Sequence, residues 1–182
     1  MEIEKLRKEY DLSVDWRPFY LRPETPPEGM PLPDYILEKV KDPNDPLKLR
    51  ARREGLKMVR GDTIFNTRRA HEAAEFAREH GKLEPMHAAL LKRHWEEGQD
   101  LYRMDVLRGA ASDAGLDPDE LQTAIESAVY RPVVEEGIRE AHDLGVHAVP
   151  TFVFDDRLAV QGAQELPVFR MAMERLGVKP LK

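Results

Sequence analysis

The chain has no cysteine among its 182 residues. This absence excludes thiol redox chemistry, thiolate metal ligation and disulfide cross-links within these residues. No apolar run approaches the roughly 20 residues that a membrane-spanning helix needs. The first residues, Met1–Lys8, also lack the apolar segment of a signal peptide. We therefore expect a cytoplasmic protein with no membrane partner.

Charge of one sign is not gathered into a block. The formal net charge is -6, and the lysines and arginines are spread along the chain. Nucleic-acid-binding domains carry a clustered basic face, so we expect no nucleic-acid partner. Hydrophobic residues make up 41% and charged residues 34% of the chain. This balance is typical of a globular protein, and the length allows one sizeable core with a subdomain.

Metal and hydroxyl-nucleophile motifs are missing as well. His87 and His94 are seven residues apart on one helix, so they lie about 10 Å apart along its axis, too far to share one metal ion. The serines Ser13, Ser112 and Ser127 do not occur in a Gly-x-Ser-x-Gly turn. We expect no metal site, and no catalytic residue can be assigned within the chain.

The N-terminal third changes its periodicity twice. Ile3, Leu6 and Tyr10 recur at spacings of three and four, which predicts a short helix. The β-favouring residues of Leu12–Leu21 predict a strand, in which Pro18 favours an edge or an end. A Pro-rich loop follows, and the pattern from Pro33 to Leu144 is helical.

The C-terminal part has clear start and stop signals. Asp117 followed by Pro118 predicts a capped helix start, and Gly115 predicts the end of the preceding helix. After Gly145 the pattern changes to two short strands, Thr151–Phe154 and Leu158–Val160, joined by a tight turn. A final helix opens near Pro167. The order is therefore helix, strand, many helices, strand, strand, helix; with one more strand in front it becomes the thioredoxin plan with helices inserted in its middle.

Four short motifs in this order carry a family resemblance. The segment Gly145–Phe154 is similar to the Gly-Val-x-x-Val-Pro-Thr-Phe stretch of DsbA-like proteins. Asp15–Phe19, Asn66-Thr67 and Gly162–Gln164 also resemble stretches of that family. The chain resembles its FrnE-like group, whose relatives are the 2-hydroxychromene-2-carboxylate isomerases and the kappa-class glutathione transferases.

The resemblance implies an α/β protein with a thioredoxin-like fold and a large helical insertion. Residues 1–31 and 129–182 are expected to form a discontinuous, incomplete thioredoxin-like domain, and residues 32–128 an inserted helical subdomain. Family members begin with a strand followed by Cys-x-x-Cys. Both are absent here, because residue 1 falls inside the helix that follows that motif in the family.

The resemblance also implies a substrate-binding loop. In a thioredoxin fold the proline before the third strand is cis, which turns the preceding backbone outward to pair with an extended peptide or with glutathione. The Val149–Pro150 bond is therefore predicted to be cis, and Val149, Pro150 and Thr151 to bind substrate. Asn66 is a further candidate lining residue facing Pro150, and His147 is a candidate at the border of the cleft.

Three functions remain open. The first is a DsbA- or FrnE-like thiol–disulfide oxidoreductase whose catalytic N-terminus is missing from this chain, with a protein thiol or disulfide as substrate. The second is a glutathione-dependent isomerase or transferase relative acting on a small molecule, for which glutathione is the cofactor; otherwise we expect none. The third is a cysteine-free, non-catalytic peptide-binding module. Because the missing strand is central in the family's sheet, its neighbours are expected to have unpaired edges, through which the chain could self-associate.

Overall fold

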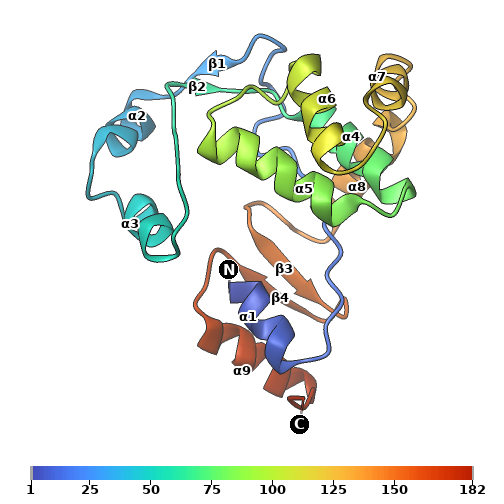
Figure 1. Cartoon of the computed structure of the whole chain (residues 1–182). Coiled ribbons are helices and arrows are strands. Elements are labelled where there is room, and N and C mark those ends of the chain that lie inside the picture. Colours follow the sequence, from blue (N-terminus) through green and yellow to red (C-terminus); the bar gives the residue numbers. More distant parts are fainter. Residues whose placement is uncertain (1, 182) are drawn as a thin grey trace. The chain divides into compact units, whose positions relative to one another are not determined.

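The computed structural model describes residues 2–181 and contains two compact units. The first unit comprises Met1–Leu21 and Gly137–Lys182, and the second comprises Arg22–Glu136 (Figure 1). The second boundary falls inside helix α8 (Arg131–Asp143), so one helix supplies residues to both units. In residues 2–181, no helix combines the length and the apolarity that crossing a membrane demands.

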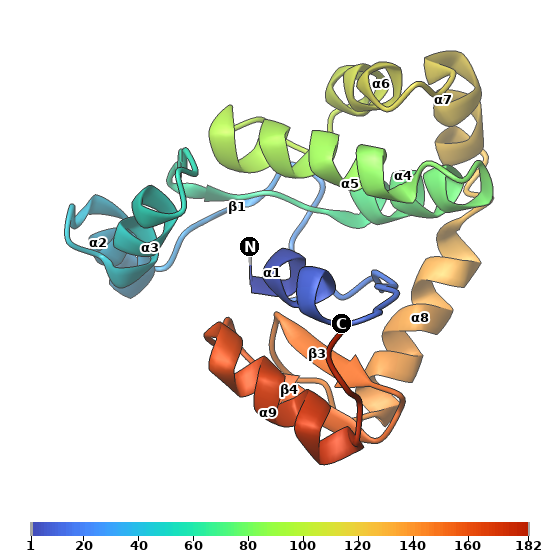
Figure 2. The ribbon, with the colours of Figure 1, turned by 60° about the horizontal axis from the view of Figure 1, so that its bottom comes forward.

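The first unit contains, among its described residues, the second half of α8 together with two further helices and a β-hairpin. The helices are α1 (Glu2–Glu9) and α9 (Leu166–Leu176), and the hairpin consists of β3 (Thr151–Phe154) and β4 (Leu158–Gln161). Figures 1 and 2 show α1, in blue, and α9, in red, beside the hairpin. Strands are few among the described residues, and the chain contains no Cys-x-x-Cys motif.

The core of this unit is small and joins the two ends of the chain. The apolar stripe predicted near the N-terminus is buried: Ile3, Leu6 and Tyr10 pack in one cluster with Phe169, Ala172 and Met173 of α9. The rings of Phe152 and Phe169 meet edge to face with centroids 4.9 Å apart, which attaches the hairpin to α9. The hairpin is therefore held by residues that are distant in sequence.

The hairpin has the predicted position. β3 and β4 pair antiparallel, with Phe154 opposite Leu158, and the strand that was expected to end at Val160 continues to Gln161. Asp155 and Asp156 in the turn have φ near +50°. This left-handed backbone suits aspartate better than most residues, because its side chain can bond locally.

The predicted strand Leu12–Leu21 does not form a sheet ladder. From Leu12 to Arg17 the exposure of the side chains alternates from residue to residue, as in a strand. Leu12 and Val14 face the core of the first unit. A strand is defined by its partner, and among residues 2–181 β3 pairs only with β4. As expected for an absent central strand, no ladder joins residues 14–19 to residues 151–154.

The second unit is mainly helical but less continuous than predicted. Its elements are β1 (Met30–Pro31), α2 (Asp34–Lys41), α3 (Pro46–Arg53), β2 (Thr63–Ile64), α4 (Arg68–Glu79), α5 (Leu83–Leu91), the π-helical turn η1 (Lys92–Glu96), α6 (Met104–Asp113), α7 (Pro118–Glu126) and the first half of α8. The long helical pattern from Pro33 is interrupted at residues 54–67, where β2 pairs with β1.

Small side chains let the helices of the second unit approach closely. Ala73 and Ala77 of α4 and Ala110 and Ala111 of α6 are completely buried. They share one cluster with larger residues, among them Phe76, Met86, Leu107 and Leu121. Small residues beside large ones allow close packing, so α4–α7 share one buried core.

The two compact units meet at residues 21/22 and 136/137. The boundaries expected from the sequence for the thioredoxin-like domain and the inserted helical subdomain, at 31/32 and 128/129, stay a prediction. Residues 22–31 belong to the helical unit because β1 pairs with β2 and because Asn66 binds the carbonyl of Thr25. The start of α8 belongs there because Tyr130 donates to Glu79 at 2.6 Å.

The helix cap predicted at Asp117 is present at the start of α7. The Asp117 carboxylate accepts from the main-chain N–H groups of Asp119, at 2.8 Å, and Glu120, at 3.2 Å, and Pro118 occupies the first turn, as predicted. Asp117→Ala is expected to lower the free energy of unfolding by about 1 kcal/mol, because both donors lose their partner. Urea titration followed by circular dichroism measures this loss. Glu135→Ala, an exposed position inside α8, serves as the control, and an equal loss in both variants would contradict the cap.

Candidate functional site

The loop from α8 to β3 is the first candidate site. Helix α8 ends at Asp143, and Gly145 has φ +74°, which is the left-handed conformation that closes a helix. The main-chain N–H of Val146 donates to Ala141 O at 2.9 Å and turns the chain away from the helix axis. Residues 146–150 then lead directly into β3.

Two hydrogen bonds fasten this loop on either side of Pro150. The Thr151 hydroxyl donates to the carbonyl of Ala148 at 2.7 Å. The main-chain N–H of Gly162 donates to the carbonyl of Pro150 at 2.7 Å, which continues the pairing of the hairpin. The Val149–Pro150 peptide bond between these attachments is cis, the isomer predicted from the sequence.

Val149 offers unused main-chain groups at this loop. Its relative exposure is 48%. Within residues 2–181, neither its N–H nor its C=O makes a hydrogen bond. Exposed main-chain groups without a protein partner are available to pair with an incoming extended chain, as in strand addition.

The free edge of β3 continues this row of groups. Bonds between antiparallel strands alternate along each strand, and the Gly162-to-Pro150 bond fixes which residues face β4. Phe152 and Phe154 therefore bond to β4, whereas the N–H and C=O groups of Thr151 and Val153 point to the opposite edge. In the described part of the chain no strand lies along that edge.

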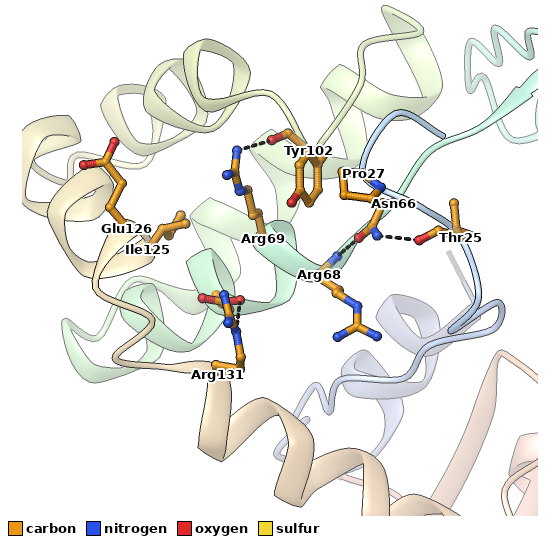
Figure 3. A pocket seen from close by; sticks show the side chains of 10 residues that line it. Thr25, Pro27, Asn66, Arg68, Arg69, Tyr102, Ile125, Glu126 and Arg131 are labelled. Atoms are coloured by element: carbon orange, nitrogen blue, oxygen red, sulfur yellow. Dashed lines mark hydrogen bonds and ion pairs between the residues drawn. The ribbon is translucent and has the colours of Figure 1, made fainter. Parts of the chain in front are cut away.

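The two remaining candidate residues, His147 and Asn66, belong to different units. His147 is exposed in the loop, two residues before Val149. Asn66 belongs to the helical unit, where it is buried: its amide donates to Thr25 O at 2.6 Å, and its side-chain oxygen accepts from Arg68 N at 2.9 Å (Figure 3). Asn66 therefore ties the loop after residue 22 to the start of α4. The sequence predicted that Asn66 faces Pro150. The two residues belong to different units, and this placement stays a prediction.

The histidines considered for metal binding lie apart in the helical unit. His87 is in α5 and His94 is in the π-helical turn η1, and burial lowers the pKa of both imidazoles. Among residues 2–181, no three side chains of histidine, aspartate or glutamate gather closely enough to hold an ion.

A second candidate site, a cavity in the helical unit, was not predicted from the sequence. Its lining includes Arg69 and Glu72 of α4, Tyr102, and Arg131 at the start of α8. A trace of it in the sequence is Glu72, a carboxylate directly beside Ala73, which is buried in the core.

Comparison with known proteins establishes the family. The profile of the DSBA-like thioredoxin domain matches residues 1–174. The chain therefore belongs to the DSBA-like thioredoxin domain family, as its motifs indicated.

Relatives with known sequence or structure support the same assignment. The chain is 27% identical over 179 residues to the "Uncharacterized protein YwbO" of Bacillus subtilis (strain 168), covering 93% of this chain and 85% of that protein. A probable DsbA oxidoreductase from Streptomyces coelicolor has a similar structure, with a TM-score of 0.78, 27% identity, and coverage of 91% of this chain and 76% of that one. A 2-hydroxychromene-2-carboxylate isomerase has a TM-score of 0.69 and 19% identity over 96% of this chain and 86% of its own, a likeness that concerns the fold alone.

Proposed function

We propose that these residues form the substrate-binding part of a DsbA-like thiol–disulfide oxidoreductase, whose reacting cysteines are not among them. The observation that carries the proposal is Val149, which is exposed and has both main-chain groups unused beside Pro150. Membership of the DSBA-like family supports the reaction class. The substrate is an extended segment of a protein that contains a thiol or a disulfide.

The loop and the free edge of β3 bind such a segment through its main chain. An extended chain laid along Val149, Thr151 and Val153 finds donors and acceptors at alternate residues, as in strand addition to a sheet edge. This pairing reads the substrate backbone and tolerates varied side chains. The bonds from Thr151 Oγ1 to Ala148 O and from Gly162 N to Pro150 O keep the loop in place while the substrate binds.

The redox step itself requires a thiolate. In this chemistry a thiolate attacks one sulfur of the substrate disulfide, a mixed disulfide forms and the other sulfur leaves as a thiolate; a second thiol then attacks the mixed disulfide and completes the exchange. The chain has no cysteine that could do this. In our proposal its own residues bind and orient the substrate, and the cysteine pair comes from outside them.

A cysteine-free peptide-binding module is the second candidate, and the complete lack of cysteine favours it. Both candidates use Val149 in the same way, and they differ only in the source of thiols. The DNA upstream of codon 1 separates them. An in-frame stretch that encodes an apolar strand and Cys-Pro-x-Cys supports the oxidoreductase, whereas a stop codon directly upstream, without an alternative start, supports the module.

Binding of an extended peptide should be visible at single amides. We expect that the alkylated B chain of insulin, added to the ¹⁵N-labelled chain, shifts the amide signals of Val149, Thr151 and Val153 and slows their hydrogen exchange. The physical reason is that these N–H groups gain main-chain partners. Val149→Ala keeps the backbone and should bind as before. Val149→Pro removes the N–H and should weaken binding by about tenfold, the value of one hydrogen bond in a desolvated site.

The proposal fails if the peptide leaves these three amides unchanged, or if it shifts only amides of the helical unit. It also fails if Val149→Pro, shown by circular dichroism to be folded, binds the peptide as tightly as the unchanged chain.

A further inference from the structure

The segment between β1 and β2, residues 32–62, forms an arm at one end of the helical unit. It consists of α2, α3 and the loop that returns to β2, and the pairing of β1 with β2 closes its base. Figures 1 and 2 show α2 and α3 next to each other and away from α6 and α7. The buried apolar residues of the arm, Val40 and Ala51, do not belong to the core that α4–α7 share. The arm is therefore an attachment to that core and not a part of it.

Polar groups help to hold the two helices of the arm. The Asp45 carboxylate accepts from the main-chain N–H of Leu47 at 3.0 Å and caps the start of α3. The ammonium group of Lys48 donates to the carbonyls of Val40 and Asp42 at the end of α2. These bonds fix the arm through groups that do not include its exposed apolar side chains.

Several large apolar side chains of the arm are exposed. The exposed fractions are 41% for Leu49 in α3, and 47% and 41% for Leu56 and Val59 in the returning loop. Tyr35 and Leu47 are exposed as well. One exposed apolar residue is ordinary, whereas a group of them on one small projection indicates a contact surface.

The second half of the arm is also basic. The chain as a whole has a net charge of -6, but residues 46–60 contain one acidic residue, Glu54, and six basic ones. The basic residues are Lys48, Arg50, Arg52, Arg53, Lys57 and Arg60. Arg52, Arg53 and Lys57 are exposed, and none of the three forms an ion pair within residues 2–181. This local excess of positive charge favours an anionic partner.

Leucine and arginine share one face of α3. Leu49, Arg52 and Arg53 follow one another at spacings of three and four, which places them on the same side of the helix. Ala51 points to the opposite side and is buried. Apolar and basic groups side by side suit the surface of an anionic bilayer, because leucine enters the boundary below the headgroups while the arginine stem reaches up to the phosphates. A nucleic acid would pair with the cations and leave the leucines without an apolar partner.

We propose that the arm binds the surface of a membrane that contains anionic lipids. Leu49 and Leu56 enter the boundary between headgroups and acyl chains, and Arg52, Arg53 and Lys57 bind lipid phosphates. The sequence led us to expect no membrane partner because no segment is apolar enough to span a bilayer, and attachment to the surface needs no such segment. The inference concerns the arm alone and does not depend on the thiol chemistry proposed above.

Co-sedimentation with lipid vesicles tests the arm directly. We expect the chain to sediment with vesicles of phosphatidylcholine that contain about one-third phosphatidylglycerol, and to bind pure phosphatidylcholine at least about tenfold more weakly, because each basic residue near an anionic surface contributes about fivefold in affinity. Molar salt should release the chain from the anionic vesicles, because the screening length falls to about 3 Å.

A paired variant measures the basic contribution. Arg52→Ser combined with Lys57→Ser should weaken binding to the anionic vesicles about 25-fold, about fivefold for each charge. The matched control combines Lys82→Ser with Arg175→Ser, which removes two exposed cations outside the arm. The control should bind as the unchanged chain does.

A single variant measures the apolar contribution. Leu56→Ser should weaken binding to the same vesicles about fivefold, because the half-exposed leucine no longer leaves water on binding. Leu144→Ser removes a leucine that is exposed outside the arm and is the control, with no change expected.

The proposal is overturned if the unchanged chain does not sediment with anionic vesicles, if it binds pure phosphatidylcholine equally well, or if the controls lose as much affinity as the arm variants. It is also overturned if Leu56→Ser binds as tightly as the unchanged chain, or if a single-stranded oligonucleotide displaces the vesicles and binds Leu56→Ser unchanged, because the arm would then be a general polyanion site. Circular dichroism checks that each variant is folded. Should an arm variant fail to fold, the lipid and salt dependence of the unchanged chain decides, and equal binding to both kinds of vesicle overturns the proposal.

Discussion

The purified chain should not raise the rate at which dithiothreitol reduces insulin above the rate of dithiothreitol alone. The thiolate is the nucleophile of disulfide exchange, and the chain has none among its 182 residues. Precipitation of the freed B chain, followed by turbidity, measures the rate. Turnover above the dithiothreitol baseline, with contaminating reductases excluded by a mock purification, would refute the prediction.

The complementary experiment supplies the strand and the cysteine pair that the proposed oxidoreductase requires. An apolar strand followed by Cys-Pro-x-Cys, fused in front of the chain, should produce turnover, because a helix N-terminus lowers the thiol pKa from about 8.5 into the range of about 3.5–7.5. The same fusion with both cysteines changed to serine is the matched control and should remain at baseline. Activity in both fusions, or in neither, would count against the proposed oxidoreductase.

Phe169→Ala should cost about 3–5 kcal/mol of unfolding free energy, the usual loss when a buried aromatic ring leaves a cavity. Phe169 is 1% exposed, and its ring meets those of Phe152 and Phe154 at centroid distances of 4.9 and 6.3 Å. It therefore joins α9 to the strand that follows Pro150, and its loss should loosen the whole first unit.

The two tryptophans allow each unit to be followed by itself. Trp16 belongs to the first unit and Trp95 to the second. In a Trp95→Phe background the remaining tryptophan is Trp16. Urea titration followed by its fluorescence should therefore report the lost unfolding free energy of the first unit. Met171→Ala, which removes a side chain that is 66% exposed on the same helix, is the control and should have little effect. A loss in Phe169→Ala no larger than that of the control would contradict the packing.

Local signals in the sequence were enough for much of the fold. Asp117-Pro118 marks a helix start because its side chain and ring act on the adjacent turn, and the structure has the cap. The hairpin that begins at Thr151 was predicted from two apolar runs separated by a short polar turn, and the structure has it. Pro150 was found by its motif, and the structure surrounds it with the bonds that position Val149.

Features that depend on contacts between residues far apart in the sequence could not be predicted from local signals. Leu12–Leu21 has the composition of a strand, but composition cannot supply a neighbouring strand. The two-residue pair of Met30–Pro31 with Thr63–Ile64 is too short to leave a periodic pattern. The Glu72 cavity escaped prediction because Tyr102, Glu126 and Arg131 are brought to α4 by packing and not by sequence spacing.

The free edge of β3 also bears on how the protein behaves at high concentration. Its sequence, Thr-Phe-Val-Phe, is apolar, β-favouring and uncharged, and Val153 is exposed on it. Edges of this kind lack the lysines or prolines that act as gatekeepers in natural sheets, and they template the stacking of identical strands into fibrils. We therefore expect copies of the chain to associate along this edge at high concentration, and a partner strand that covers the edge to reduce that association.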